Sequence, residues 1–307
     1  MTSDPAVARP RVWLPFLVVV LIWGSTWIVI RDQLGSGGVT VPPSWSVSYR
    51  FLVAGLALGA VAIVRRERVA WTRDFLGFAA ALALLQFVLN FNFVYRAEAH
   101  ITSGLVAVVF ALLVVPNAVL ARLFLKQRVS ARFVAGSAVA AAGVALLFVH
   151  EARADPGAVG ATLTGIALTG CAILSASCAN VMQATARARR HAMVPTLAVA
   201  MLMGSAMDAA FALATVGPPV IDPRPAYLAG LLYLGLVGSS LAFTLYFRII
   251  RAIGPAKAAY NGVMVPVVAM ALSTLFEGYR WSALAAAGAL LAMAGLVIAL
   301  SARRPAG

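Results

Sequence analysis

Ten runs of mostly apolar residues, each close to the length needed to cross a lipid bilayer, fill almost the whole chain. A membrane-spanning helix needs about 20 such residues. Hydrophobic residues make up 62% and charged residues 11% of the 307 positions, so the chain is far more apolar than a soluble domain. From the charged residues, Pro and Gly at the run boundaries, we expect transmembrane helices over residues 13–31, 44–64, 75–95, 101–121, 132–149, 160–182, 193–215, 227–247, 256–276 and 281–301.

The positions of Lys and Arg predict the orientation of these helices. The 24 basic residues lie mainly in alternate connections, such as residues 65–73, 122–132 and 187–190, while the connections between those hold few. Basic residues are retained on the cytoplasmic side of a membrane. We therefore expect a multi-pass protein of the bacterial inner membrane with both termini in the cytoplasm. Because the basic residues sit at helix ends, the net charge of +14 does not indicate a nucleic-acid surface.

The two halves of the chain share a spacing of proline and glycine that indicates a duplication. The matching positions are Pro116 with Pro266, Gly136 with Gly288, and Gly143 with Gly295, which are separated by 150, 152 and 152 residues. A unit of five helices enters the membrane in the opposite sense to the preceding unit. The expected fold is therefore an all-α membrane protein with ten transmembrane helices in two inverted five-helix repeats, residues 1–155 and 156–307. In secondary transporters of this plan the substrate binds near the midplane, between the halves.

Polar side chains inside the apolar runs are the candidates for substrate binding, because burying them in hydrocarbon is costly. Gln86 and Asn90 share one helical face, and their amides can bind a zwitterion without adding net charge. Trp23, Ser25 and Thr26 lie at the centre of the first run, where they can form apolar and polar walls of a site. The alternative for all five is packing and hydrogen bonding between helices.

The second half of the chain supplies further polar candidates for the same site. They are Tyr233, Ser239, Tyr260 and Asn261. Tyr246 lies nearer a predicted membrane interface, where tyrosines form an aromatic belt, and we expect it there rather than in the site.

Arg50 and Asp208 are the clearest charges inside predicted helices. Counting the helical rise places each about 10 Å below the outer surface. We predict that they form an ion pair that sets the outer gate, while the alternative for Arg50 is snorkelling to the outer headgroups. An ion pair would hold Asp208 ionised and leave no obvious proton carrier. We then expect export down the substrate's own gradient, with proton-coupled antiport as the alternative.

Two prolines interrupt predicted helices at corresponding positions of the two halves. Pro116 and Pro266 each remove a backbone hydrogen bond and kink the helix, so they are candidate hinges for alternating access, with static kinks as the alternative. The Gly- and Ala-rich runs at 132–149 and 281–301 present smooth faces, which favour close packing and a scaffold role.

Enzyme signatures are missing from the sequence. It contains no phosphate-binding P-loop, no His-Glu-x-x-His metal motif, no Cys/His metal cluster and no Gly-x-Ser-x-Gly elbow. We therefore expect neither an enzyme nor a primary pump, and no metal or cofactor. A membrane-embedded enzyme or a purely structural subunit remains the alternative class of function.

Three stretches carry a family resemblance: LIWGSTWIVIR in the first run, SYRFLVAG in the second, and VPVVAMALSTLFEGYRWSALAAAGALLAMAG near the end. They resemble the EamA-type repeats of the drug/metabolite transporter (DMT) superfamily, over nearly the whole chain. Members often carry an acidic residue in the turn before the last helix of each repeat. Glu277 before Gly278 matches this pattern, whereas the first copy reads Lys126, Gln127, Arg128 and departs from it.

The resemblance implies two five-helix repeats and export of amino acids or related metabolites, and the chain is most similar to the bacterial aromatic amino-acid exporters. The rival within transport is a multidrug or nucleotide-sugar type carrier. A small-multidrug antiporter needs a glutamate in the middle of the first helix, which has no acid before Asp32. A phosphorylated substrate needs several cavity cations, and the sequence offers only Arg50. The expected partners are a small-molecule substrate and the lipid bilayer, and the oligomeric state stays open, with a monomer compatible with the sequence.

Overall fold

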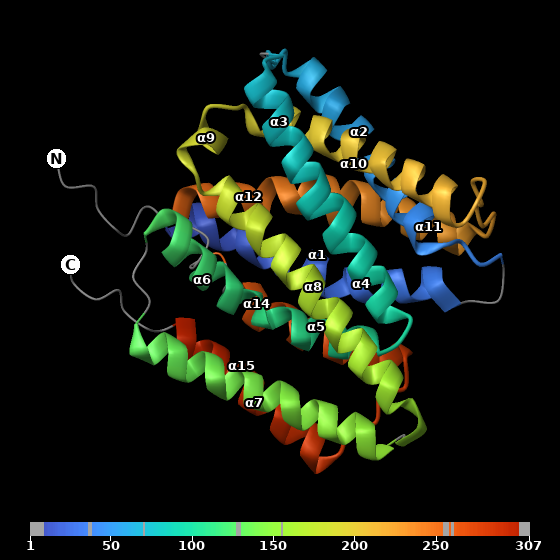
Figure 1. Cartoon of the computed structure of the whole chain (residues 1–307), viewed down its shortest axis with the longest axis vertical. Coiled ribbons are helices and arrows are strands. Elements are labelled where there is room, and N and C mark those ends of the chain that lie inside the picture. The colour runs from blue at the N-terminus through green and yellow to red at the C-terminus, as the bar shows by residue number, and fades with distance from the viewer. Residues whose placement is uncertain are drawn as a thin grey trace.

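The computed structural model describes residues 9–35, 39–69, 71–126, 130–154, 156–253, 258 and 261–300, and Figure 1 shows them as a bundle of helices without strands. The first half contains α1 (Arg9–Gly35), α2 (Pro43–Val64), α3 (Arg73–Leu82), η1 (Ala83–Leu89), α4 (Asn90–Glu98), α5 (Ser103–Phe110), η2 (Ala111–Leu113), α6 (Val114–Leu125) and α7 (Ala131–Ala154).

The second half follows a short 3-10 turn, η3 (Pro156–Ala158). It contains α8 (Val159–Gln183), α9 (Ala186–Arg189), α10 (Met193–Thr215), α11 (Pro225–Leu232), η4 (Tyr233–Leu241), α12 (Ala242–Ile253), α14 (Asn261–Phe276) and α15 (Ala283–Leu300).

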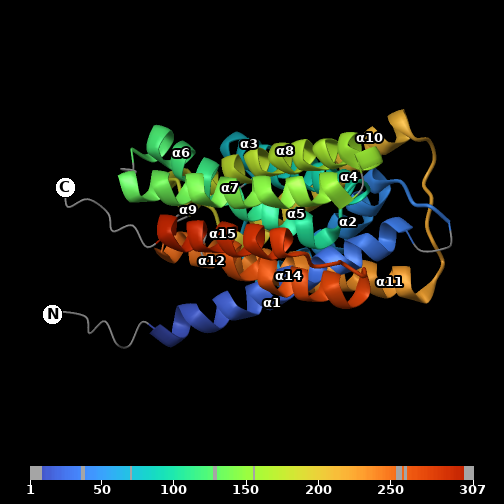
Figure 2. The same cartoon turned by 90° about the horizontal axis from the view of Figure 1, so that it is seen from below.

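Eight helices of the described residues are long and apolar enough to cross a membrane, and Met264–Phe276 and Ala283–Ala299 are shorter apolar helices. Eight of the ten predicted runs thus match full-length spans, and the count of ten is not confirmed. Part of the predicted helix 256–276 falls at 256, 257, 259 and 260, outside the described residues. Figure 2 shows that α1 begins and α15 ends at the same end of the bundle, which we call the terminal end; the other is the opposite end.

Two of the spanning helices contain a π-helical segment at corresponding places. The span Arg73–Glu98 contains η1, and the span Pro225–Ile253 contains η4. Each π segment packs on the second long helix of the other half, because η1 contacts α10 and η4 contacts α2. A π turn widens the helix locally and often marks a functional site. The widened turns therefore lie where the two halves meet.

The α7 and α15 helices pack on each other more closely than side chains would allow. A Cβ atom added at Gly143 would lie 2.3 Å from the backbone nitrogen of Ala292, and one added at Gly295 would lie 2.2 Å from that of Ala140. Figure 1 shows this pair of helices along one side of the bundle. The glycine and alanine faces thus make the close contact expected from the sequence.

Two turns at helix ends have matching backbone conformations in the two halves. Arg66 after α2 has φ 52°, and Gly217 after α10 has φ 92°. Lys126 after α6 has φ 55°, and Gly278 after α14 has φ 68°. Positive φ is a conformation that glycine adopts without strain. The second half therefore has glycine where the first half holds a basic residue in a left-handed turn.

Candidate functional site

A cavity of about 100 Å³ lies inside the bundle and takes its walls from both halves of the chain. It is wide enough for several water molecules, each of which needs roughly 10–15 Å³ by this measure. Its polar or aromatic lining residues are Trp23, Thr26, Trp27, Arg50, Gln86, Asn90, Phe91, Phe110, Asn180, Phe243, Tyr246 and Asn261.

The cation of this cavity is Arg50, which is only 1% exposed. Its Nε atom donates a hydrogen bond of 2.8 Å to Oγ of Ser239, and its guanidinium carbon lies 4.4 Å from the ring centroid of Phe91. The Nη1 atom is buried and has no hydrogen-bond partner among the described residues. A buried, unpaired guanidinium N–H is a strong site for an anionic ligand group.

Three of the buried amides that line the same cavity carry unpaired side-chain atoms. Gln86, Asn90 and Asn261 are each 3% exposed. The side-chain oxygens of all three, and the nitrogen of Asn261, have no hydrogen-bond partner within the described part of the chain. The nitrogen of Asn90 donates to the backbone oxygen of Gln86, across the π segment. Because unpaired buried polar atoms are costly, these oxygens are suited to receive a donor such as an ammonium group.

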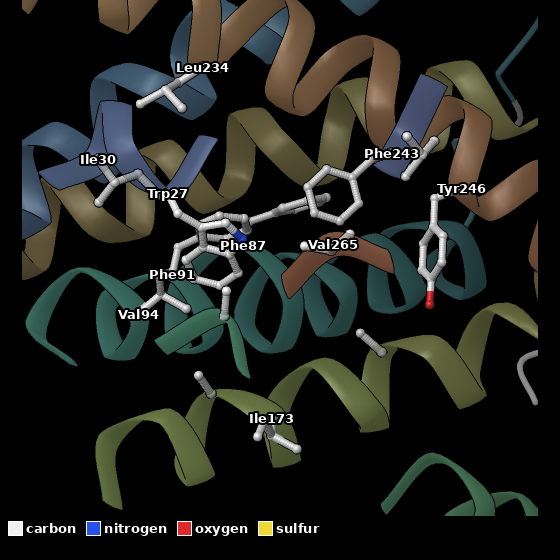
Figure 3. Close-up of a cluster of buried hydrophobic side chains, with 14 of the residues drawn as sticks. Trp27, Ile30, Phe87, Phe91, Val94, Ile173, Leu234, Phe243, Tyr246 and Val265 are labelled. Carbon is white, nitrogen blue, oxygen red and sulfur yellow. The ribbon is translucent and has the colours of Figure 1, made fainter. Parts of the chain in front are cut away.

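Aromatic rings form the rest of the wall. Figure 3 shows Trp27, Phe91 and Phe243 close together in the apolar cluster, with the rings of Phe91 and Phe243 6.0 Å apart. Trp23 lies edge-on to Tyr246, with centroids 4.7 Å apart. The Nε1 atom of Trp23 donates to the backbone oxygen of Gly238 at 3.2 Å, which ties α1 to η4. The cavity thus pairs polar groups with a large aromatic surface.

The predicted site residues divide into those that line the cavity and those that do not. Trp23, Thr26, Gln86, Asn90 and Asn261 line it. The hydroxyl groups of Ser25 and Tyr233 instead form a hydrogen bond of 2.6 Å with each other. The hydroxyl of Ser239 accepts the hydrogen bond from Nε of Arg50. Tyr260 lies outside the described residues. Pro266 lines the cavity from within α14, and Pro116 follows the 3-10 turn η2.

The predicted ion pair between Arg50 and Asp208 is absent from this structure, in which both residues are described. Asp208 is fully buried, and its Oδ1 atom accepts a hydrogen bond of 2.6 Å from Asn92. Arg96 is the charged neighbour of Asp208, and it donates to the Asn92 side-chain oxygen at 2.7 Å. The prediction rested on equal depth alone, and the helix rotation turns the two side chains toward different neighbours.

A second group of charges closes the bundle at the opposite end. We call Arg31, Glu98, Ser103 and Glu277 the end cluster. The Arg31 Nε atom lies 3.8 Å from Oε1 of Glu277, and Ser103 Oγ donates to Oε2 of Glu277 at 2.7 Å. Nη1 of Arg31 donates to the backbone oxygen of Glu98. These contacts join α1, α4 and α5 to the turn after α14.

Comparison with known proteins decides the family. The EamA-like transporter family matches residues 12–149 and 163–301, which together cover most of the chain. The chain belongs to this family. It is therefore a multi-pass inner-membrane transporter built of two EamA repeats, and not an enzyme.

Relatives with assigned names agree with this placement. An uncharacterized inner membrane transporter of Escherichia coli strain K12, YedA, is 30% identical over 84% of this chain and 80% of its own. A probable amino-acid metabolite efflux pump of Salmonella typhimurium strain LT2 is 27% identical over 92% of both chains. A probable terminal-alkyne amino-acid exporter of Streptantibioticus cattleyicolor is 28% identical over 94% of this chain and 92% of its own.

A solved crystal structure shares the fold of this EamA transporter. It covers 95% of this chain and 98% of its own with a TM-score of 0.67, at 19% sequence identity. At that identity the likeness concerns the arrangement of helices alone.

Proposed function

We propose that this EamA transporter exports an amino acid or a similar small zwitterion across the inner membrane, and that the substrate binds in the cavity between the two repeats. The observation that carries the proposal is the set of polar atoms around the cavity. The free Nη1 of Arg50 suits a carboxylate, and the unpaired oxygens of Gln86, Asn90 and Asn261 suit an ammonium group. The aromatic wall suits an apolar side chain. The names of two relatives, an amino-acid metabolite efflux pump and an amino-acid exporter, support the same class.

The multidrug and nucleotide-sugar alternatives fit this cavity less well. Arg50 is the one Lys or Arg among the described residues that line it. A diphosphate needs more than one cation in a water-poor site, and a cationic drug needs a carboxylate, which the lining does not supply.

We propose that transport runs by alternating access between two inverted repeats, divided near residues 155 and 156, with the terminal end in the cytoplasm. The end cluster then closes the outer side, and Pro116 and Pro266 are hinge candidates. Impermeant thiol reagents test this orientation. A cysteine replacing Val39, which is 50% exposed, is expected to react from outside, and one replacing the exposed Arg190 from inside. The reverse pattern would refute the orientation.

Efflux from liposomes tests the substrate class and the role of Arg50 together. The liposomes are loaded with phenylalanine, leucine, aspartate or lysine, and with phenylalanine methyl ester, which lacks a free carboxylate. A charge-assisted hydrogen bond contributes about 1.5–3 kcal/mol, so Arg50→Gln is expected to weaken use of the free acids by roughly 10- to 100-fold. Use of the ester is expected to change far less.

Arg96→Gln is the matched control, because Arg96 is a partly buried arginine that does not line the cavity. It is expected to keep the preference of the parent for acid over ester. Equal losses for acid and ester in Arg50→Gln would remove the carboxylate role, and no efflux of any amino acid would refute the proposed function.

A further inference from the structure

Glu98 of the end cluster is a buried acid that the proposed substrate site does not use. Glu98 is 0% exposed, and neither of its carboxylate oxygens has a hydrogen-bond partner among the residues that the structure describes. Arg31 contacts the backbone oxygen of Glu98 rather than its carboxylate. An ionised carboxylate without a partner in such a place is strongly unfavourable, and the group avoids this cost by holding a proton.

The charged groups around Glu98 come from α1, α2 and the turn after α14. Arg31 of α1, Arg50 of α2 and Glu277 after α14 interact with it electrostatically, as does Tyr95 on its own helix. Arg31 already pairs with Glu277, and Arg50 donates to Ser239. The long helix α8, which packs along α4, contains no Asp, Glu, Lys or Arg.

Burial away from water, together with the neighbouring Glu277, favours a neutral Glu98 in the closed cluster. Glu277 adds a second negative charge beside Glu98, and like charges in one site disfavour ionisation of one of them. The side chain of Arg31 is 41% exposed, so water screens part of its charge, whereas Glu277 is 8% exposed. Arg31 is partly screened and Arg50 is hydrogen-bonded to Ser239, so these two cations offset only part of the cost of burying Glu98 beside Glu277.

The end cluster sits directly over the cavity. Arg31 follows the lining residue Ile30, Glu98 is four residues after the lining residue Val94, and Ser103 is four residues before the lining residue Ala107. One helical turn is about 5.4 Å. Opening the bundle at this end for substrate release must therefore separate the cluster and admit water to Glu98.

We propose that Glu98 is a proton-binding site of the outer gate: closing the gate binds one proton on its carboxyl group, and opening the gate releases it. The proposal rests on the proposed orientation, in which the cluster faces outside. When the gate is open, Glu98 meets water and ionises as an ordinary exposed glutamate does. Near neutral pH, acid on the outside therefore favours the closed gate, and alkali favours the open gate.

The size of the effect follows from linkage. One proton bound in the closed state and absent in the open state changes the ratio of the two by up to tenfold for each pH unit. The proposal revises the expectation of a proton-independent exporter, because the return of the empty gate to its closed state then depends on external protons.

A cysteine in place of Ala107 reports the open gate, since Ala107 is 1% exposed and lies one turn beneath Ser103. The native Cys171 and Cys178 are first replaced by Ala. Right-side-out membrane vesicles without substrate receive an impermeant thiol reagent from outside at external pH 5 to 8. Because thiol reactivity itself depends on pH, each rate is divided by that of a cysteine at the exposed Val39.

We expect the normalised labelling of Ala107→Cys to rise steeply with external pH, approaching tenfold per unit. Glu98→Gln, which imitates the protonated acid, is expected to label slowly at every pH. Glu98→Asp is expected to keep the slope, and so is Asp32→Asn, the matched control, because Asp32 is an exposed acid next to Arg31.

A flat profile in the parent, or a slope that persists in Glu98→Gln, would overturn the proposal. The parent profile alone is decisive if Glu98→Gln does not fold. Since no substrate is present, an error in the proposed substrate class would leave the labelling result unchanged, so the two proposals fail separately.

Discussion

The contact between α7 and α15 allows a sharp test of how this fold is held together. A methyl group added at Gly295 would lie 2.2 Å from the backbone nitrogen of Ala140 and 2.6 Å from the backbone oxygen of Gly136. The optimal separation of two non-bonded carbon atoms is at least about 3.5 Å, so the two helices must move apart by about 1 Å at this position. Because the obstacle is backbone, no side-chain rotation can relieve it.

Two opposing effects set the stability of Gly295→Ala. Replacing glycine by alanine inside a helix favours the helix by about 1 kcal/mol, whereas overpacking costs typically about 1–3 kcal/mol. In lipid, helices associate mainly through van der Waals packing, so separating them also weakens neighbouring contacts. We expect the free energy of unfolding to fall by about 1–2 kcal/mol.

The assay is reversible denaturant unfolding in detergent micelles, followed by circular dichroism. Gly170→Ala in α8 is the matched control, because a methyl group there meets no atom within 4 Å. It is expected to be neutral or slightly stabilising. In the double variant Gly143→Ala/Gly295→Ala, the second methyl group enters a contact that the first has already widened. The loss of stability in the double variant is therefore expected to be smaller than the sum of the two single losses. Equal stability of Gly295→Ala and Gly170→Ala would refute the packing argument.

Three further predictions concern other parts of the structure. Arg66→Gly is expected to raise the free energy of unfolding by roughly 0.5–1 kcal/mol, because a left-handed residue other than glycine is strained; thermal unfolding measures this. Trp23→Phe is expected to lose about 0.5–1.5 kcal/mol with its hydrogen bond to Gly238, measured in the same way. The stability changes of Asn92→Ala and Asp208→Ala are expected to be non-additive in a double-variant cycle, because the two side chains share a hydrogen bond. Those of Arg50→Gln and Asp208→Asn are expected to add within about 0.5 kcal/mol.

Each of these predictions has its own control. Arg65→Gly is expected to lose stability, since Arg65 has an ordinary right-handed φ of −78°. A gain at Arg65 equal to that at Arg66 would contradict the strain argument. Unchanged stability in Trp23→Phe would mean that its N–H finds water instead. Strong coupling between Arg50 and Asp208 would restore the predicted ion pair.

Apolar runs bounded by charged residues, Pro and Gly predicted most of the helices. Eight of the ten expected runs correspond to full-length spans, and the range 193–215 agrees with α10 at both ends. The prediction is strong here because a lipid-exposed helix has to be apolar along its whole length. The last two runs form shorter described helices.

The site was only partly predictable, because a nearly uniform apolar helix does not reveal which of its faces points inward. Tyr246 is a correction: the expected belt residue is 3% exposed and lines the cavity. Trp27 and Asn180 also line it, and neither was a candidate. Glu98 was not a candidate, because the third helix was expected to end at residue 95, whereas it continues to Glu98. A search for every acid within one turn of a predicted helix end would have found it.

Pairing within the site depends on helix rotation, which sequence spacing gives only for a regular α-helix. The π-helical segment η1, Ala83–Leu89, interrupts that regularity before Asn92. The direction in which Asn92 points, toward Asp208, therefore could not be worked out by counting residues from the start of the helix. The direction of each side chain was therefore not predictable from helix spacing alone.

The close contact of α7 with α15 also bears on how such a chain could have arisen. Gly136 meets Gly295 and Ala299 of the other helix, and the equivalent Gly288 meets Gly143 and Leu147, so the same positions of the two repeats face one another in reverse order. A contact of this kind, in which one patch meets a copy of itself, is the isologous contact of a two-fold homodimer. A single repeat that carries this face therefore has a surface complementary to a second copy of itself, so joining two copies requires no new interface.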